Sequence, residues 1–312
     1  MISMSTDRIK GDIISGKQFT RGQMEGLFDD ASALKSVFSA RKRLDDARGR
    51  IIATVFMEPS TRTRLSFQFA GVTIGASVID FGSSDMSSIV KGETFEDTMR
   101  MIDDYGPDVI VLRQRVSGNA ARAADICDAP VINAGDGSNE HPTQALLDTF
   151  TIRELMGKVD GLTIGMMGDL RYGRTTSSLS YVLDKFDDIT VYYIAPQELK
   201  MREEVTAQLR NLRYKSITRP DDIMEDLDVL YVTRLQKERF TDPSQYDALK
   251  GSYSITLDYL RKFKKVPIIM HPLPRIDELS VDVDALPQAK YFEEARNGLY
   301  VRAALLKQIL NV

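Results

Sequence analysis

Hydroxyl and guanidinium groups are concentrated in one short segment, Glu58–Arg64, which has the sequence EPSTRTR. It follows an apolar, β-branched run and opens a stretch with helical spacing, so backbone N–H groups and the positive end of a helix dipole would face a strand end. Ser60, Thr61 and Thr63 add hydroxyl donors, and Arg62 adds a forked guanidinium. Helix capping would explain one hydroxyl, but not three beside two arginines. The segment therefore predicts a phosphate site built without a glycine-rich loop.

Further polar residues fall where a strand ends or a helix begins. Arg113 follows the apolar run 108–112, at the kind of strand end where open α/β sheets bind ligands. His141 precedes Pro142 at a predicted helix start, and Gln144 comes three residues later. This pair is compatible with an N-terminal cap, and equally with a neutral imidazole that donates to a carbonyl oxygen gaining charge.

A serine-rich segment at residues 83–94, SSDMSSIVKGET, has the composition of a polar surface loop. Thr94 and Asp97 make a capping pattern for the helix that follows. On this segment alone, Lys91 is more simply a solvated side chain than a functional one.

The second half of the chain also places arginines after apolar runs. The glycines of GMMGDLRYGRT superficially resemble a dinucleotide fingerprint, but their spacing is not G-x-G-x-x-G. Arg174 in this segment and Arg234, just past the run Val229–Thr233, could converge on a dicarboxylate. Each arginine taken singly is equally a surface ion pair of little energetic value. In Met270–Arg275, MHPLPR, two prolines predict a stiff connector that holds out carbonyl oxygens.

Short apolar runs alternate with amphipathic stretches along most of the chain. The alternation predicts an α/β fold with two domains, each a parallel sheet flanked by helices, joined by long helices. The pattern divides near residue 142, where HPTQALLDTFTIREL predicts one long helix. We expect a first domain at 1–141, completed by a C-terminal helix at 290–312 that is buried over 299–310, and a second domain at 142–289. The predicted strands are Ile51–Phe56, Ser77–Phe81, Asp108–Leu112, Val131–Asn133, Leu162–Met167, Thr190–Ile194, Val229–Thr233 and Ile268–Met270.

Charge and composition exclude several classes of function. The 312 residues carry a net charge of -4, which leaves no basic footprint for nucleic acid or an anionic membrane. No apolar run approaches the roughly 20 residues that span a bilayer, and the N-terminal sequence has no secretory pattern. A single cysteine, Cys127, excludes an intrachain disulfide and a cysteine-based metal site. We therefore expect a cytoplasmic protein that binds an anionic ligand through a local cluster of cations.

Taken together, these segments resemble the aspartate/ornithine carbamoyltransferase family. The matching strings are EPSTRTRLSF, VKGET, NAGDGSNEHPTQALLD, GLTIGMMGDLRYGRT, LDVLYVTRLQKERF and IMHPLPRIDEL, and they extend over nearly the whole chain. The occurrence of STRTR, HPTQ and HPLP in this order is highly specific. Ornithine enzymes of the family typically have HCLP as the last motif, so HPLP, with DLRYGR and TRLQKER, favours aspartate as the acceptor.

The resemblance implies transfer of the carbamoyl group of carbamoyl phosphate to aspartate, an early step of de novo pyrimidine biosynthesis, with no metal and no organic cofactor. The residues implied to bind carbamoyl phosphate are Ser60, Thr61, Arg62, Thr63, Ser87, Arg113, His141, Gln144, Leu273 and Pro274. Those implied to bind aspartate are Lys91, Arg174, Arg234 and Gln236, and those implied in catalysis are Arg62, Thr63, Lys91, Arg113 and His141.

The resemblance also implies a homotrimer with shared active sites, in which Ser87 and Lys91 reach the site of a neighbouring subunit. Whether the trimer stands alone or joins regulatory chains is left open by the sequence. Glu58 would tie the two domains together through Arg174 and Arg239.

The chain departs from the family pattern at several positions. Arg113-Gln114-Arg115 stands where RHP is usual, so the arginine is kept and the next two residues differ, and Arg171 and Ser177 replace a lysine and a histidine. Arg296, in ARNG, is a cation beside a helix expected to be buried, and the sequence offers no account of it.

Overall fold

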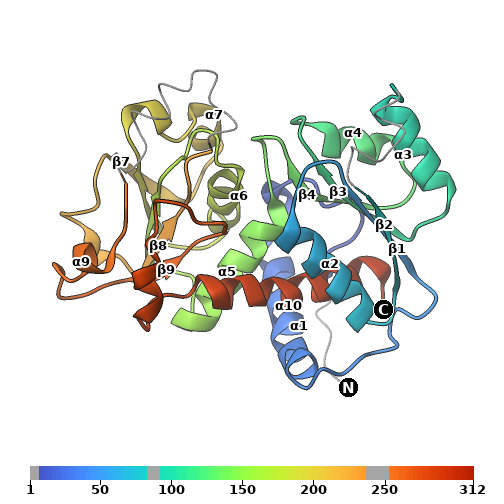
Figure 1. Ribbon diagram of the computed structural model, residues 1–312, viewed down its shortest axis with the longest axis horizontal. Coiled ribbons are helices and arrows are strands. Elements are labelled where there is room, and N and C mark those ends of the chain that lie inside the picture. The colour runs from blue at the N-terminus through green and yellow to red at the C-terminus, as the bar shows by residue number, and fades with distance from the viewer. Residues whose placement is uncertain (1–6, 83–91, 237–252) are drawn as a thin grey trace. The chain divides into compact units, whose positions relative to one another are not determined.

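The computed structural model describes residues 7–82, 92–236 and 253–312 (Figure 1). Internal contacts divide the chain into two compact units, Met1–Phe150 with Arg296–Val312, and Thr151–Ala295. Helix α5 (Pro142–Met156) begins in the first unit and ends in the second, and helix α10 (Tyr291–Leu310) runs from the second back into the first. The expected domain boundary lies between residues 141 and 142, immediately before α5. The boundary between the two compact units instead falls within α5.

The first unit is built on a four-stranded sheet of order β2-β1-β3-β4, all parallel. Strand β4 (Val131–Asp136) is buried throughout, and so are β1 (Ile51–Phe56) and β3 (Val109–Gln114) over most of their length, whereas the edge strand β2 (Ser77–Phe81) is largely exposed. Helices flank the sheet, as expected when parallel strands are apolar on both faces (Figure 1). Besides parts of α5 and α10, they are α1 (Arg21–Ser39), α2 (Thr61–Thr73), α3 (Phe95–Asp104) and α4 (Asn119–Ile126).

The second unit has a five-stranded parallel sheet of order β7-β6-β5-β8-β9. Its strands are β5 (Thr163–Met167), β6 (Thr190–Ile194), β7 (Arg213–Ile217), β8 (Val229–Val232) and β9 (Ile268–Met270). Among its described residues, the α-helices that lie wholly within this unit are α6 (Arg174–Leu183), α7 (Glu203–Thr206) and α9 (Leu257–Leu260). The predicted α/β class with parallel sheets flanked by helices is confirmed.

All eight predicted strands are present, four of them with the predicted bounds. Sequence analysis missed β7, an edge strand of sequence RYKSI whose residues are almost all exposed. Its apolar content is too low to stand out, because an edge strand pairs on one side only and faces solvent.

Helix α10 spans Tyr291–Leu310, within the range 290–312 expected for the C-terminal helix. Its segment 301–306 is buried, as predicted, while Arg296 lies on the exposed side of the helix, which accounts for a cation at that position. Among the residues described, no helix is long and apolar enough to cross a membrane.

Candidate active site

The predicted phosphate site is the turn between β1 and α2. Ser60 is the N-cap of α2, with extended backbone angles, but its hydroxyl makes no capping hydrogen bond. Simple capping therefore does not explain this serine. Thr61 and Arg62 are exposed at the first turn of the helix, and Thr63 is buried beneath them. Arg64 belongs elsewhere, because its guanidinium pairs with Asp80 of β2.

Arg113 lies at the same edge of the sheet as this turn. The register pairs Phe56, the last residue of β1, with Arg113 of β3, and the Met57 amide donates to the Arg113 carbonyl at 2.9 Å. The guanidinium donates from Nη2 to Glu58 Oε1 at 2.7 Å and from Nη1 to the Ala134 carbonyl at 3.3 Å. Glu58 thus pairs with Arg113; the contacts expected from Glu58 to Arg174 and Arg239 stay a prediction.

Thr63 and His141 meet at the inner side of the site. Thr63 Oγ1 lies 3.4 Å from His141 Nε2, and both side chains are buried. His141 ends the segment after β4, and its carbonyl accepts the Gln144 amide at 3.0 Å as α5 begins. The Gln144 side chain does not fold back as a cap; Nε2 donates to the buried Asp148 at 2.8 Å. The structure thus brings together the ends of β1, β3 and β4, as the sequence predicts.

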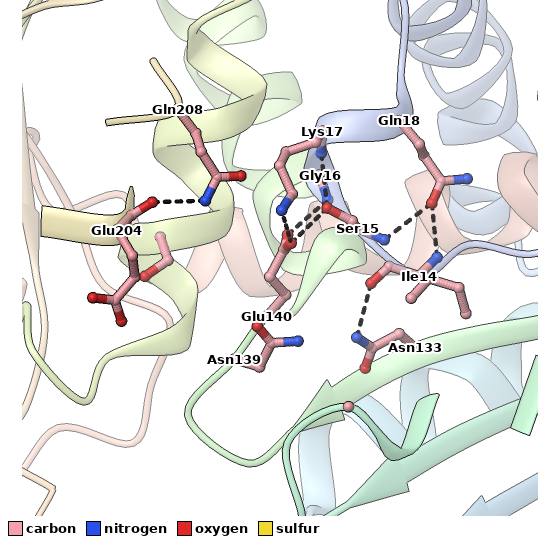
Figure 2. A network of polar contacts seen from close by, with 12 residues as sticks. Ile14, Ser15, Gly16, Lys17, Gln18, Asn133, Asn139, Glu140, Glu204 and Gln208 are labelled. Atoms are coloured by element: carbon pink, nitrogen blue, oxygen red, sulfur yellow. Dashed lines mark hydrogen bonds and ion pairs between the residues drawn. The ribbon is translucent and has the colours of Figure 1, made fainter. Parts of the chain in front are cut away.

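Buried carboxylates hold the turn that carries His141 (Figure 2). Glu140 accepts from Ser15 Oγ at 2.5 Å and from the Gly16 amide at 2.7 Å, and Lys17 Nζ is 3.9 Å away. Figure 2 shows this carboxylate pointing at the short 3-10 helix η1 (Gly16–Gln18). Nearby, the Asn133 side chain donates to the Ile14 carbonyl at 3.0 Å. The residue before His141 is thereby fixed to a segment more than a hundred positions earlier.

Asp136 is the second buried carboxylate of the turn. It accepts from the backbone amides of Gly118 and Glu140 at 2.8 and 3.2 Å and from the side chains of Asn133 and Asn139 at 2.9 and 3.0 Å. A carboxylate taken out of water is stable only when its oxygens are hydrogen-bonded in this way. The turn is therefore ordered by its own sequence.

The departure at Gln114-Arg115 leaves the anchoring of Arg113 intact. Gln114 is the last residue of β3; its carbonyl accepts the Gly137 amide at 2.8 Å, and its side chain accepts the Arg115 amide at 2.5 Å. Arg115 is exposed. A Cβ at Gly137 would lie 2.8 Å from the Arg115 carbonyl oxygen, so the approach of these two loops requires glycine.

In the second unit, Asp169 joins the two loops that carry the predicted aspartate-binding residues. Oδ1 accepts the Tyr172 amide at 2.9 Å, one residue before the N-cap of α6, which begins at Arg174. Oδ2 accepts the Gln236 amide at 3.2 Å, beyond β8 and Arg234. Burial raises the pKa of Asp169, against these hydrogen bonds and the nearby charge of Arg234. Arg174, Arg234 and Gln236 are all partly exposed at the carboxyl edge of the sheet.

The loops meet closely at Gly168, where φ is +119° and an added Cβ would lie 2.1 Å from the Thr233 carbonyl oxygen. Only glycine allows this approach. In GMMGDLRYGRT, Gly168 therefore serves loop packing, whereas Gly165 lies within β5, where an added Cβ would meet side chains of the core.

The HPLP segment follows β9 and is fixed by its own histidine. His271 Nδ1 accepts the Leu273 amide at 2.8 Å, and Nε2 lies 2.8 Å from Glu278. Burial alone would raise the pKa of Glu278, but the hydrogen bonds that its carboxylate accepts from His271 and from the backbone hold this pKa below its usual value. Leu273, with φ of +53°, is partly exposed, and Pro274 is exposed.

The two departures in DLRYGRTTSS have simple local accounts. Ser177 is buried and accepts from Arg202 Nη2 at 3.1 Å. Arg171 is exposed, with its guanidinium 5.6 Å from the centre of the Tyr172 ring.

Ser87, Lys91 and Arg239 lie outside the described residues. Within the described part of the chain, no group of three histidine, cysteine or acidic residues has the arrangement of a metal site. Sequence analysis did not single out Glu140, Asp148 or Asp169, because a buried acid is identified by its partners, and these come from other parts of the chain.

Comparison with known proteins gives a consistent assignment. The carbamoyl-P binding domain of the aspartate/ornithine carbamoyltransferase family matches residues 11–154, and the Asp/Orn binding domain of the same family matches residues 160–309. The aspartate carbamoyltransferase catalytic subunit of Thermofilum pendens is 49% identical over 304 residues, covering 96% of this chain and 95% of its own length.

Solved structures agree with these matches. Aspartate transcarbamoylase from Trypanosoma cruzi in complex with carbamoyl phosphate and aspartate is 40% identical, with a TM-score of 0.92 over 98% of both chains. The catalytic subunit of aspartate transcarbamoylase from M. jannaschii is 45% identical, with a TM-score of 0.87 over 96% of this chain and 98% of that one.

We predict that Glu140→Ala destabilises the first unit by about 2 kcal/mol, because it leaves the buried Gly16 amide and the half-buried Ser15 hydroxyl without this acceptor. Glu140→Gln, which keeps an acceptor oxygen and can donate to Ser15, should cost less than about 1 kcal/mol. Urea unfolding of both variants measures the difference. Equal losses in the two variants would contradict the role assigned to this carboxylate.

We also predict a pH-dependent effect at Asp169. Since its folded-state pKa is raised above 3.8, its protonation favours the folded state, and that stabilisation is fully present below pH 3.8 and lost as the pH rises through the folded pKa. The non-titrating variant Asp169→Asn lacks this component. The free energy of unfolding of the native protein relative to the variant should therefore fall between pH 4 and neutrality; a difference independent of pH would refute the assignment.

Proposed function

Since the chain belongs to the aspartate/ornithine carbamoyltransferase family, we propose that it transfers the carbamoyl group of carbamoyl phosphate to the amino group of L-aspartate. The products are N-carbamoyl-L-aspartate and phosphate, and the reaction belongs to pyrimidine biosynthesis in the cytoplasm. The structural observation that carries the proposal is the meeting of Thr63 and His141, 3.4 Å apart, beneath the anion-binding turn at Ser60.

The phosphate of carbamoyl phosphate is held at the N-terminus of α2. Backbone N–H groups of the first turn, the hydroxyls of Ser60 and Thr61 and the guanidinium of Arg62 are its donors. Arg113 contributes from the neighbouring strand end, since parallel pairing places it at the same edge. Charge-assisted hydrogen bonds of this kind are about twice as strong as neutral ones.

The carbonyl oxygen of the carbamoyl group lies among Thr63, Arg113 and His141. A neutral imidazole and a threonine hydroxyl donate to the oxygen as it gains charge, and one such donor is typically worth about 3 kcal/mol in the transition state. Gln144, whose amide nitrogen is held by Asp148, presents its oxygen to the carbamoyl NH₂ group. The backbone carbonyls of Leu273 and Pro274 accept from the same group.

Attack requires the amino group of aspartate as a free base. Its lone pair forms the new C–N bond, the C–O bond to phosphate breaks, and the proton of the attacking nitrogen passes to the departing phosphate. No side chain needs to act as a covalent nucleophile. The acceleration then comes from charge stabilisation and from the positioning of two anions.

Aspartate is held by Arg174, Arg234 and Gln236. Arg174 begins α6 and Arg234 follows β8, so both guanidiniums start from the carboxyl edge of one sheet. Asp169 couples their loops through the amides of Tyr172 and Gln236. Two arginines on a common frame match the two carboxylates of aspartate and disfavour ornithine, whose side chain ends in a cation.

The proposal includes a homotrimer with shared active sites, to which Ser87 and Lys91 contribute from a neighbouring subunit. An apolar row on the outer face of α2 supports it: Leu65, Phe69 and Val72 are 45, 55 and 47% exposed, at i, i+4 and i+7. Ile79, on the adjacent edge strand, is 61% exposed. The row continues from the phosphate-binding turn, so a second copy seated on it lies close to the site.

We predict that the purified chain forms N-carbamoyl-L-aspartate from carbamoyl phosphate and aspartate and forms no citrulline from ornithine. Arg234→Ala should raise the KM for aspartate about 100-fold or more, because it removes a bidentate carboxylate contact. Arg213→Ala is the matched control, since that arginine makes an exposed ion pair with Asp188 on the edge strand. Citrulline as the only product, or an unaffected Arg234→Ala variant, would refute the assignment.

We predict a molecular mass in solution three times the 35.1 kDa of one chain, measured by light scattering. Leu65→Glu with Phe69→Glu should give inactive monomers, whereas Val281→Glu, at a residue 70% exposed on the other unit, should leave mass and activity unchanged. Mixing Lys91→Ala with Arg113→Ala trimers should restore activity by forming intact shared sites. Failure of the mixed preparation to recover activity would exclude sharing.

A further inference from the structure

The C-terminal helix carries a buried cation that the reaction above does not use. Arg302 of α10 is 3% exposed. Its Nη1 donates to Ser66 Oγ of α2 at 2.6 Å, and its guanidinium carbon lies 5.2 Å from the centre of the Phe67 ring. One turn earlier in α10, a Cβ at Gly298 would lie 2.8 Å from Arg302 Nη1, so the glycine leaves room for the guanidinium.

One path from Arg302 leads to the phosphate-binding helix. Ser66 Oγ, which accepts from Arg302, donates to the Thr63 carbonyl at 2.9 Å. Thr63 Oγ1 is in turn 3.4 Å from His141 Nε2. The guanidinium is thus two hydrogen bonds behind a residue that contacts the reacting carbonyl group.

Arg302 also interacts electrostatically with charged side chains near the site. The negative charge of Asp148 and the positive charge of Arg113 both act on Arg302, although burial is the larger effect and lowers the pKa of the guanidinium to about 9. Asp148 is fully buried and accepts from Gln144 Nε2 at 2.8 Å. Arg302 therefore lies within the electrostatic reach of the carboxylate to which Gln144 donates.

The arrangement is not what stability alone would favour. Burial of a guanidinium is unfavourable unless every donor is satisfied, and among the described residues Nε and Nη2 of Arg302 have no hydrogen-bond acceptor. A methionine of similar length would fill the space between α2 and α10 without that cost. A cation retained here indicates a role in the charge of the site.

We propose that Arg302 is a positioning residue for carbamoyl phosphate, which holds Thr63 through Ser66 and adds positive potential behind the phosphate-binding turn. The inference rests on the proposed function, because it names the substrate group that Arg302 serves. The chemical class of the ligand is a small phosphate dianion.

The test compares Arg302→Met with Arg302→Lys and with Lys307→Met. Lys307 is on the same helix and pairs with Asp46 at the surface, so its loss removes a cation without touching the site. We expect Arg302→Met to raise the KM for carbamoyl phosphate and the Kd for inorganic phosphate roughly tenfold or more, with a smaller change in the KM for aspartate. Arg302→Lys should recover part of this loss, and Lys307→Met should match the native protein.

Thermal unfolding of each variant separates positioning from packing. A folded Arg302→Met variant with native phosphate affinity and a native KM for carbamoyl phosphate would overturn the inference, as would a loss that Arg302→Lys fails to reduce. If Arg302→Met does not fold, Ser66→Ala is measured instead, because it removes only the hydroxyl that links Arg302 to the Thr63 carbonyl. We expect Ser66→Ala to raise the KM for carbamoyl phosphate by a smaller factor. Phosphate binding by the native chain that weakens in Arg302→Met supports the inference even if no carbamoyl-aspartate is formed, so the two proposals can fail separately.

Discussion

Parallel pairing of β1 with β3 is the constraint on which the candidate site depends. It sets Phe56 opposite Arg113, so the turn that opens α2 and the guanidinium of Arg113 reach the same edge of the sheet. The next pair, β3 with β4, shifts register between Leu112 and Gln114, and the Gln114 carbonyl then accepts the amide of Gly137. Three strand ends thus deliver hydroxyl, guanidinium and imidazole groups that are far apart in the sequence. A sheet buried on both faces cannot slip without exposing its core, so this geometry is as stable as the fold.

Carboxylates rather than cations organise the loops at this edge. Asp136 and Glu140, on the turn before His141, are almost fully buried. Their carboxylate oxygens accept hydrogen bonds from backbone and side-chain donors. Asp169 does the same for the two arginine-bearing loops of the second unit. Each acid would be costly to bury without those donors, so any loop conformation that removes them is disfavoured. The loops therefore lose most of their conformational entropy when the protein folds, before a ligand binds.

The chain's sequence predicts which groups stand at strand ends, because apolar runs and helical spacing are local signals. EPSTRTR, Arg113 and His141 could be found in this way, and so could the parallel sheets. Partners could not: Arg64 pairs with Asp80 and Glu58 with Arg113, and neither pairing follows from spacing along the chain. Arg296 and Arg302 make the same point, since two cations on one helix look alike in the sequence, yet one is exposed and the other is buried. The edge strand β7 was missed because its polar residues carry no local signal of pairing.

A chain of net charge -4 that binds two anions depends on where its few site cations point. Arg113 is already oriented by Glu58 and by the Ala134 carbonyl, with its side chain 13% exposed. A free arginine loses about 2 kcal/mol of rotamer entropy when a ligand immobilises it, and an arginine held in this way has lost most of it on folding.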